Sequence, residues 1–311
     1  MDLVTTESCY SKDNDREEDE VLLQPYLQFT QIGHARAKYI SSMFHCFNYW
    51  LKVPQEQLKQ IINIFETQYN SFVMLDDIYD GSVARSGVPV MHSIYGLPHT
   101  LNSVNYATSN ALEKLLDLGD PRIMPLYIEH GQKMHAGNGM EIYWRDNIIC
   151  PTEKEYLEIA VPKTSSAFCF GIKVMQLFSD NSENLDKLVT TLGQLFQIWN
   201  DLVTLKSEKQ TLVRSYCADI TEGKFTFPII HAIQTHPHDD KIINILKQRT
   251  TSYELKKYFV SILEKYGSFD YTLEVLNKLK NEAVQEVERL GGNPYIDNVV
   301  EYILDKLETV G

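Results

Sequence analysis

The chain contains 311 residues, 43% of them hydrophobic, so it is long enough to bury a substantial core in one or two domains. Acidic residues outnumber basic residues by 42 to 29, and the net charge of −13 disfavours nucleic acid or an anionic membrane as a partner. The five cysteines form no metal-binding pair, and no signal peptide or apolar run of about 18 residues occurs, so the sequence predicts a cytoplasmic protein without structural zinc.

The first part of the chain differs sharply in composition from the rest. Residues 1–20 are polar and acidic and cannot bury apolar surface, which predicts a disordered tail before a single domain over 21–311. In that domain apolar residues recur at three- and four-residue spacing, as in Leu58, Ile61 and Phe65. Alternating patterns typical of strands are scarce, so the sequence predicts an all-α fold.

Glycine and proline clusters mark the expected breaks between helices. They divide the domain into about ten helical segments. One start is specified in detail, because Thr152 and Glu155 have the spacing of a capping box, with Thr152 as the N-cap.

An acidic run, Asp76-Asp77-Ile78-Tyr79-Asp80, follows the apolar-periodic segment 58–75 and directly precedes Gly81. On a helix Asp76 and Asp80 project from one face. Like charges at that spacing repel by a few tenths of a kcal/mol, so a bound cation is the functional interpretation. A solvated acidic helix end explains this motif equally well when it is considered alone.

A second polar stripe lies further along the chain. Asn200, Thr204 and Glu208 recur every four positions and would share one helix face. Amide, hydroxyl and carboxylate oxygens are the hard ligands that Mg²⁺ prefers. A polar face toward solvent is the alternative, but the apolar segment 195–199 before the stripe indicates that its start is buried.

Two such helices facing each other would hold metal ions that need a polyanion to bridge them, and diphosphate is the natural candidate. Arg85, Lys163 and Lys224 lie beside predicted loops and helix ends, where they would contact it. Each of them alone is explained as well by an ordinary surface cation.

At this point the sequence resembles the animal geranylgeranyl diphosphate synthases, from about Pro25 to the C-terminus. The resemblance rests on four segments, Asp76-Asp77-Ile78-Tyr79-Asp80, Pro89-Val90-Met91-His92-Ser93-Ile94-Tyr95-Gly96, Ile142-Tyr143-Trp144-Arg145-Asp146-Asn147 with Cys150-Pro151-Thr152-Glu153, and Thr221-Glu222-Gly223-Lys224-Phe225-Thr226-Phe227-Pro228. It implies an all-α prenyl-synthase fold, one helical bundle around a deep apolar cavity, usually in a homodimer. It also implies that Asp76 and Asp80 bind Mg²⁺ with Asp77 in support, and that Arg85, Lys163 and Lys224 hold the allylic diphosphate.

The sequence departs from the chain-elongating members where they bind isopentenyl diphosphate. Tyr69 occupies the position of a histidine, Ser86 that of the second arginine of an Arg-Arg-Gly, and the Gly-Lys-x-x-Arg segment is altered at 33–38. Each lost charge-assisted contact to phosphate costs about 1.5–3 kcal/mol. The second substrate pocket is therefore expected to be lost, unless Arg36 or Lys38 compensates.

The second metal motif departs in the same direction, because Asn200-Asp201-Leu202-Val203-Thr204 with Glu208 resembles the Asn/Asp-Asp-Leu-x-Ser/Thr-x-x-x-Glu motif of terpene synthases. The resemblance implies a terpene synthase like the insect enzymes derived from prenyl diphosphate synthases, using about three Mg²⁺ ions. The metal ligands expected are Asp76, Asp77, Asp80, Asn200, Asp201, Thr204 and Glu208. The catalytic residues expected are Asp76, Asp80, Arg85, Lys163 and Lys224, and the substrate contacts expected are Phe72, Tyr69, Ser86, Gln197 and Thr164.

Phe72 lies one helical turn before Asp76, where a large ring is expected to shorten the cavity. Geranyl diphosphate is therefore the favoured substrate, followed by farnesyl diphosphate, with a mono- or sesquiterpene hydrocarbon such as an ocimene-type product. A residual prenyl elongase is the first alternative. A non-catalytic partner subunit of a prenyl synthase is the second, although that role predicts decay of Asp76, Asp80 and Asp201, which are all present.

Overall fold

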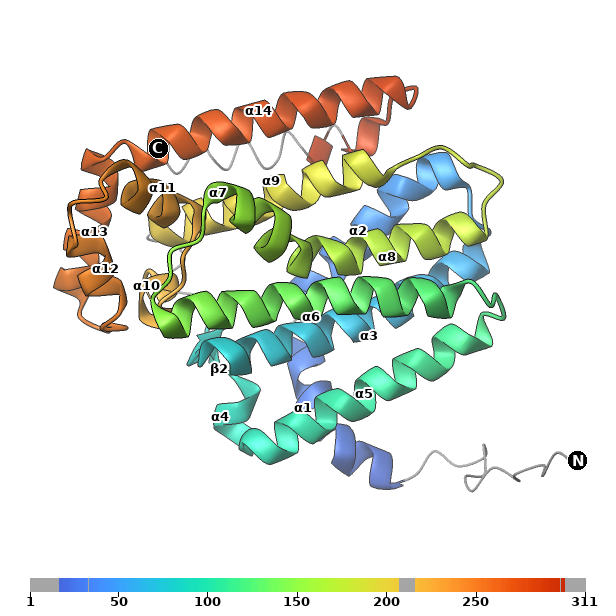
Figure 1. Cartoon of the computed structure of the whole chain (residues 1–311). Helices are drawn as coiled ribbons and strands as arrows, with labels where there is room; N and C mark the ends of the chain where they lie inside the picture. Colours follow the sequence, from blue (N-terminus) through green and yellow to red (C-terminus); the bar gives the residue numbers. More distant parts are fainter. Residues whose placement is uncertain (1–16, 33, 207–215, 297, 300–311) are drawn as a thin grey trace, which may run out of the picture.

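A computed structural model describes residues 17–32, 34–206, 216–296 and 298–299 of the chain. Figure 1 shows that these residues form a layered bundle of long helices with a group of shorter helices at one end. The all-α class predicted from the sequence is confirmed. The described residues contain fourteen α-helices and one π-helix, more than expected, because several breaks enclose short helices of their own.

The elements and their bounds, in chain order, are α1 (Glu17–Ile32), α2 (His34–Leu51), α3 (Gln55–Asp80), β1 (Ala84–Arg85), β2 (Val88–Pro89), α4 (Met91–Tyr95), α5 (Leu97–Asp117), α6 (Ile123–Asn147), α7 (Glu153–Glu155), the π-helix η1 (Tyr156–Ala160), α8 (Val161–Leu177), α9 (Asp186–Lys206), α10 (Ala218–Glu222), α11 (Phe227–Thr235), α12 (Lys241–Leu246), α13 (Tyr253–Lys265) and α14 (Ser268–Arg289).

The local sequence explains where two of these helices begin and end. The N-cap side chain of Thr152 accepts a hydrogen bond from the Glu155 N–H, and the Glu155 carboxylate accepts one from the Thr152 N–H, so the predicted capping box is confirmed. Helix α3 ends at Gly81, whose φ of 64° is the left-handed conformation that glycine adopts without strain.

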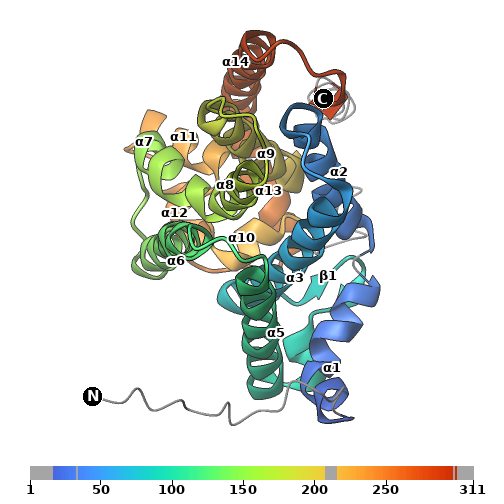
Figure 2. The same cartoon turned by 90° about the vertical axis from the view of Figure 1, so that its right-hand side faces the viewer.

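Long helices pack side by side around the centre of the molecule. Helix α6 packs on α8, α8 on α9, α3 on α5, and α9 on α14. Figure 2 shows α1 and α5 at one end of the bundle and α14 at the other. Buried residues from Ile40 to Ile296 form one contiguous core, and a smaller cluster around Met74 and Val104 joins α3 to α5.

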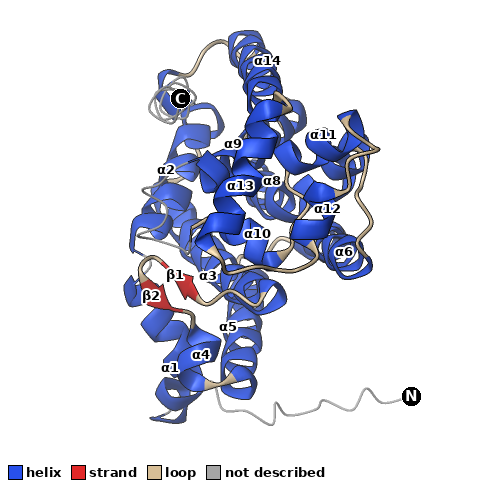
Figure 3. Ribbon diagram, turned by 90° about the vertical axis from the view of Figure 1, so that its left-hand side faces the viewer, coloured by secondary structure: helices blue, strands red, loops and turns tan. Residues whose placement is uncertain are grey.

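A short antiparallel hairpin of β1 and β2 interrupts the helices just after α3 (Figure 3). Its two turn residues, Ser86 and Gly87, have φ values of 56° and 78°. Two positive φ values in a two-residue turn match the tight hairpin geometry that suits the twist of paired strands. The hairpin brings Arg85 back toward the end of α3.

The start of the domain differs slightly from the prediction. Residues 17–20, expected in the tail, belong to α1, and Asp19 accepts a hydrogen bond of 2.6 Å from the Tyr106 hydroxyl on α5. The remainder of the predicted tail, 1–16, lies outside the described residues. Within the described ranges no helix is both long and apolar enough to cross a bilayer, and the cysteines found there are free thiols.

Candidate active site

The three predicted carboxylates lie in the last turn of α3. The side chains of Asp77 and Asp80 are only 3% and 6% exposed, whereas that of Asp76 is 20% exposed. No basic residue shares this turn, and the C-terminal end of a helix carries partial negative charge. The carboxylates therefore oppose the stability of α3 itself, and cations from other elements offset their charge.

Two lysines approach Asp76 and Asp80, the first and the last of the three carboxylates. Lys163 on α8 lies between Glu141 of α6, with which it forms an ion pair, and Asp76, whose Oδ1 is 3.7 Å from the Lys163 Nζ. Lys224, just after α10, pairs with Asp80 and lies 3.2 Å from Glu222. Burial opposes both positive charges, but the neighbouring carboxylates outweigh it and raise the pKa of each lysine above its usual value.

Arg85 contacts the same helix end from strand β1. Its Nη2 and Nε lie 2.5 and 2.6 Å from Asp77 Oδ1, and its Nη2 lies 3.8 Å from Asp76 Oδ2. The buried pair fixes the hairpin against α3. Asp77 is thus held by Arg85, which agrees with a supporting role, while Ser86 is exposed at the hairpin tip.

Sequence reasoning did not assign two further members of this cluster. Arg145, near the end of α6, donates to the Tyr79 carbonyl at 2.8 Å, and its Nη1 lies 3.5 Å from Asp80 Oδ1. Glu222 is buried and accepts a hydrogen bond of 2.9 Å from Ser82. Both residues stand in segments that carry the family resemblance, which was the available signal, but their partners come from distant parts of the chain.

Asp80 is the most crowded carboxylate of the group. Burial raises its pKa to about 7, with Asp76 and Glu222 acting in the same direction and Lys224 opposing them. A further cation beside Asp80 would therefore be favourable.

The residues present fit Mg²⁺ as the cation. Asp76 and Asp80 supply hard oxygen donors on one helix face, and Mg²⁺ in proteins commonly uses one or two carboxylates and completes its shell with water and phosphate. Among the described residues no three His, Cys, Asp or Glu side chains form a metal site by themselves. Such an ion would therefore depend on phosphate oxygens as well.

The second predicted motif lies on α9, and its members separate into two roles. Asp201 is buried, and its oxygens accept hydrogen bonds from the Tyr156 hydroxyl (2.6 Å), the Gln197 amide (3.0 Å) and the Phe227 N–H (2.9 Å). Burial raises its pKa to about 6. These contacts tie α9 to η1 and α11, so Asp201 holds helices together where the sequence predicted a metal ligand, and the Gln197 amide nitrogen is engaged with it.

The other members of this motif are only partly described. Asn200 is half-buried, and Thr204 is buried with its hydroxyl donating to the Asn200 carbonyl at 2.9 Å. Glu208 lies outside the described residues, as does the side chain of Thr164. Their predicted roles stay predictions.

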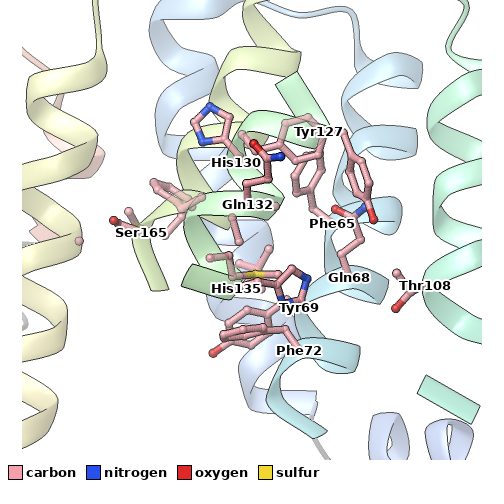
Figure 4. A pocket seen from close by; sticks show the side chains of 18 of the residues that line it. Phe65, Gln68, Tyr69, Phe72, Thr108, Tyr127, His130, Gln132, His135 and Ser165 are labelled. Atoms are coloured by element: carbon pink, nitrogen blue, oxygen red, sulfur yellow. The ribbon is translucent and has the colours of Figure 1, made fainter. Parts of the chain in front are cut away.

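A cavity of about 360 Å³ lies between α2, α3, α5, α6, α8 and α9, and its lining on α3 reaches Leu75, the residue before Asp76 (Figure 4). Tyr69 and Phe72, two of the predicted substrate contacts, line it. The cavity continues past Phe72 to Phe65, about two helical turns deeper on α3. Phe72 therefore forms part of the wall, and the lining on α3 extends beyond it.

Residues of five further elements complete the lining. They are Ile40, Met43 and Phe44 of α2, Thr108 of α5, Tyr127, Ile128, His130, Gly131, Gln132, Met134 and His135 of α6, Ser165, Ala167, Phe168 and Phe170 of α8, and Leu192, Gly193 and Phe196 of α9, beside Phe65, Gln68, Tyr69, Phe72 and Leu75 of α3. Most of this surface is apolar, so the cavity suits a hydrocarbon chain.

Comparison with known proteins agrees with this arrangement. A family model described as polyprenyl synthetase matches residues 20–263. A protein named terpene synthase from Matsumurasca onukii is 43% identical over 299 residues, covering 96% of this chain and 98% of that protein. Geranylgeranyl pyrophosphate synthases from Mucor circinelloides f. lusitanicus and Dictyostelium discoideum are 39% identical over 298 residues and 38% over 284. These two matches cover 95% and 91% of this chain and 97% and 93% of the relatives.

The family model covers well over half of the sequence, and the relatives match it nearly from end to end. The family resemblance inferred from the sequence motifs is thereby confirmed. The chain belongs to the polyprenyl synthetase family.

Proposed function

We propose that the protein is a terpene synthase that ionises one allylic prenyl diphosphate with Mg²⁺ and releases diphosphate and a hydrocarbon. Membership of the polyprenyl synthetase family supports an enzyme that acts on prenyl diphosphates, and the relative named terpene synthase supports the lyase reaction. One observation carries the proposal, namely that the described cations Lys163, Lys224 and Arg85 gather at the carboxylates of α3. Ser86 and Tyr69, at positions expected to contact a second diphosphate, are uncharged.

Each part of the site has a defined task in this reaction. When bound, Mg²⁺ stabilises the negative charge that develops on the leaving diphosphate. Lys163 and Lys224 donate charge-assisted hydrogen bonds to the phosphate oxygens, and their carboxylate partners position them for this before substrate arrives. Below them, the aromatic faces of Tyr69 and Phe72 stabilise the allylic cation, and the apolar wall keeps water from quenching it.

Geranyl diphosphate is the favoured substrate of the proposed reaction, followed by farnesyl diphosphate. Loss of a proton from the allylic cation then releases a mono- or sesquiterpene hydrocarbon, for which an ocimene-type compound is the simplest outcome. The proton leaves to a base, and the released diphosphate is the acceptor that the reaction itself supplies.

The test is to incubate the purified protein and Mg²⁺ with geranyl or farnesyl diphosphate, with and without isopentenyl diphosphate, and to identify products by mass spectrometry. Hydrocarbon from the single substrate is the expected result. A longer prenyl diphosphate formed only when both substrates are present would overturn the proposal.

The prenyl elongase remains the second candidate, because the two geranylgeranyl pyrophosphate synthases are nearly as similar to the chain as the terpene synthase. It requires a second cationic pocket, for which Arg36 or Lys38 would have to serve, and the side chains of both lie outside the described residues. The same incubations separate the two reactions. No turnover of any substrate would favour the non-catalytic subunit.

Asn200 offers a narrower test of the second metal motif. We expect Asn200→Ala to abolish hydrocarbon release, because the amide oxygen is lost as a Mg²⁺ ligand. Asn184→Ala is a matched control on the loop before α9, where the Asn184 side chain accepts a hydrogen bond from the backbone N–H of Asp186. Undiminished product from the Asn200 variant would remove this motif from the mechanism. The same experiment with Glu208→Ala tests the residue that the structure does not describe.

Three further expectations stay predictions, namely the homodimer, the cytoplasmic location and the number of Mg²⁺ ions. Size-exclusion chromatography with light scattering measures the first directly. A monomer that is fully active would contradict it.

A further inference from the structure

The end of the cavity remote from Phe72 carries buried polar groups without partners, although a hydrocarbon tail offers nothing for polar groups to bind. His130 of α6 lines this end, is 5% exposed, and stacks on Phe170 with ring centroids 6.1 Å apart and planes 28° apart. Neither ring nitrogen of His130 has a hydrogen-bond partner in the protein. The amide nitrogen of Gln68, one turn above Phe65 on α3, is likewise buried and unpaired. Figure 4 shows His130 and Tyr127 at the end of the cavity remote from Phe72.

Burial also decides the charge of this histidine. Burial lowers the pKa of His130, Lys133 acts in the same direction, and Glu129 opposes them. The imidazole is therefore neutral near pH 7, with one N–H donor and one lone pair to satisfy. A cavity of about 360 Å³ has room for water, and water bound to these groups removes the cost of leaving them unpaired.

We propose that His130 is a specificity-determining residue, which limits the length of the prenyl chain by polarity and not by bulk. A chain that reaches the imidazole displaces its water and returns no hydrogen bond, whereas a shorter chain leaves the water in place. The inference rests on the proposed use of an allylic prenyl diphosphate and specifies its length. It also supplies a reason for the geranyl preference that Phe72 does not provide.

The positions of these residues along α3 and α6 place the threshold between two and three prenyl units. His130 precedes Glu141 on α6, and Phe65 precedes Asp76 on α3, by about three helical turns, or about 16 Å. An extended chain advances about 1.2 Å per bond, so two four-bond prenyl units span about 10 Å and three span about 14 Å. With its first carbon near the level of Asp76, a geranyl tail ends short of His130 and the last unit of a farnesyl tail approaches it.

Polarity and bulk make opposite predictions for one substitution. Phenylalanine is larger than histidine and has no polar atom, so His130→Phe removes the water without adding space. If polarity sets the limit, the variant binds the farnesyl chain better relative to the geranyl chain. An unpaired buried group costs about 5- to 150-fold in affinity, which sets the size of the expected gain. If bulk sets the limit, the same variant loses farnesyl affinity.

The experiment measures dissociation constants of geranyl and farnesyl S-thiolodiphosphate, which do not ionise readily, by calorimetry with Mg²⁺. The expected result is a rise of about 5- to 150-fold in the farnesyl-to-geranyl affinity ratio for His130→Phe. His130→Gln keeps a hydrogen-bond donor and an acceptor at this end of the cavity. This variant is expected to keep the wild-type farnesyl-to-geranyl affinity ratio. An unchanged or lower ratio in His130→Phe overturns the proposal.

Gln68→Leu provides an independent variant should His130→Phe fail to fold, as judged by circular dichroism. This substitution removes the unpaired Gln68 amide at nearly constant side-chain volume, so the farnesyl-to-geranyl affinity ratio is again expected to rise. A lower or unchanged ratio would contradict a limit on chain length set by polarity. Because the readout is binding of an unreactive analogue, an elongase reaction would overturn the proposed function without affecting this result.

Discussion

Asp76 and Asp80 lie one turn apart on the same helix face, yet they differ in burial and in the closeness of their cationic partners. Asp76 is partly exposed, with Lys163 and Arg85 at 3.7 and 3.8 Å. These separations are longer than those of a direct hydrogen-bonded ion pair, and one-fifth of the Asp76 side chain is open to solvent. The carboxylate is therefore placed for binding more than for folding.

We expect Asp76→Asn to lower kcat/KM for the allylic diphosphate by about 10²- to 10³-fold. It should also raise the Mg²⁺ concentration needed for half-maximal rate, with little change in Tm. Asp186→Asn is a suitable control, because Asp186 is exposed and pairs with Lys173 at 2.8 Å. An Asp76 variant with wild-type Mg²⁺ dependence would show that this carboxylate binds no metal.

Asp80 should behave differently because it is buried and paired with Lys224. Removing one member of a buried ion pair costs about 3–5 kcal/mol, and Glu222, 3.2 Å from Lys224, offsets part of that cost here. We expect Asp80→Asn to lose activity together with stability, measured as the free energy of unfolding in urea. Equal stability of this variant and Asp76→Asn would contradict the distinction drawn between the two positions.

At the scale of elements, the approach of α6 to η1 and α8 depends on one glycine. A Cβ added at Gly137 would lie 2.7 Å from the Ile159 carbonyl oxygen and 3.0 Å from Lys163 Cβ. The backbone at that point is a π-helix, and single turns of π-helix are frequent at functional sites. The close contact fixes the position of the Lys163 backbone. It therefore determines which carboxylates the Lys163 ammonium group can reach.

Gly137→Ala should therefore push α8 away from α6 and weaken the Lys163 contacts with Glu141 and Asp76. We expect a loss of about 1–3 kcal/mol in stability and a higher KM for the allylic diphosphate. Gly139→Ala is the matched control on the same helix, because its added Cβ meets nothing within 4 Å. That control should be neutral or stabilising by up to about 1 kcal/mol. Identical KM values for the two variants would contradict the proposed contact.

Sequence patterns predicted elements that depend on neighbours along the chain. The capping box at Thr152 is one case, and the shared face of Asp76 and Asp80 is another. They did not predict η1, because a π-helix arises here where Gly137 of another helix packs against it. The role of Asp201 was missed for the same reason, since its partners Tyr156 and Phe227 come from separate elements.

At the scale of the whole molecule, helical periodicity was sufficient for the fold class, and the ordered motifs were sufficient for the family. The depth of the cavity was not predictable from Phe72, because a ring on a helix face narrows or closes a cavity according to what packs opposite. Here the space continues to the level of His130 and Phe65. That space depends on five further helices from other parts of the chain.

Stability against acid should depend in part on Asp239, which connects the end of α11 with the end of α13. Its carboxylate accepts hydrogen bonds from the Lys241 ammonium at 2.8 Å and from the Tyr266 hydroxyl. The Lys241 side chain is the main cause that lowers the pKa of Asp239, and the Tyr266 hydroxyl acts in the same direction. A carboxyl whose pKa is lower in the folded state stabilises the fold above its unfolded pKa of about 3.9, and this stabilisation is lost as pH falls toward the folded value.

We therefore expect Asp239→Asn to lower Tm at pH 7 and to lower it by less at pH 3, where the wild-type carboxyl has begun to lose its advantage. Thermal melts of both proteins across this range provide the measurement. A difference in Tm that stays constant with pH would show that Asp239 acts through packing alone.

In the substrate-free site every carboxylate of the α3 end already has a cationic partner, and this has a thermodynamic consequence for loading. Mg²⁺ alone would displace Lys163 from Asp76 and Lys224 from Asp80, and each buried ammonium group would keep only one of its carboxylate partners, Glu141 or Glu222. Diphosphate alone would draw the same lysines away from Asp76 and Asp80. When both arrive, the carboxylates pass to the metal and the ammonium groups to the phosphates. Each ligand therefore strengthens the binding of the other by the same factor, so the metal affinity of the empty enzyme understates its affinity during turnover.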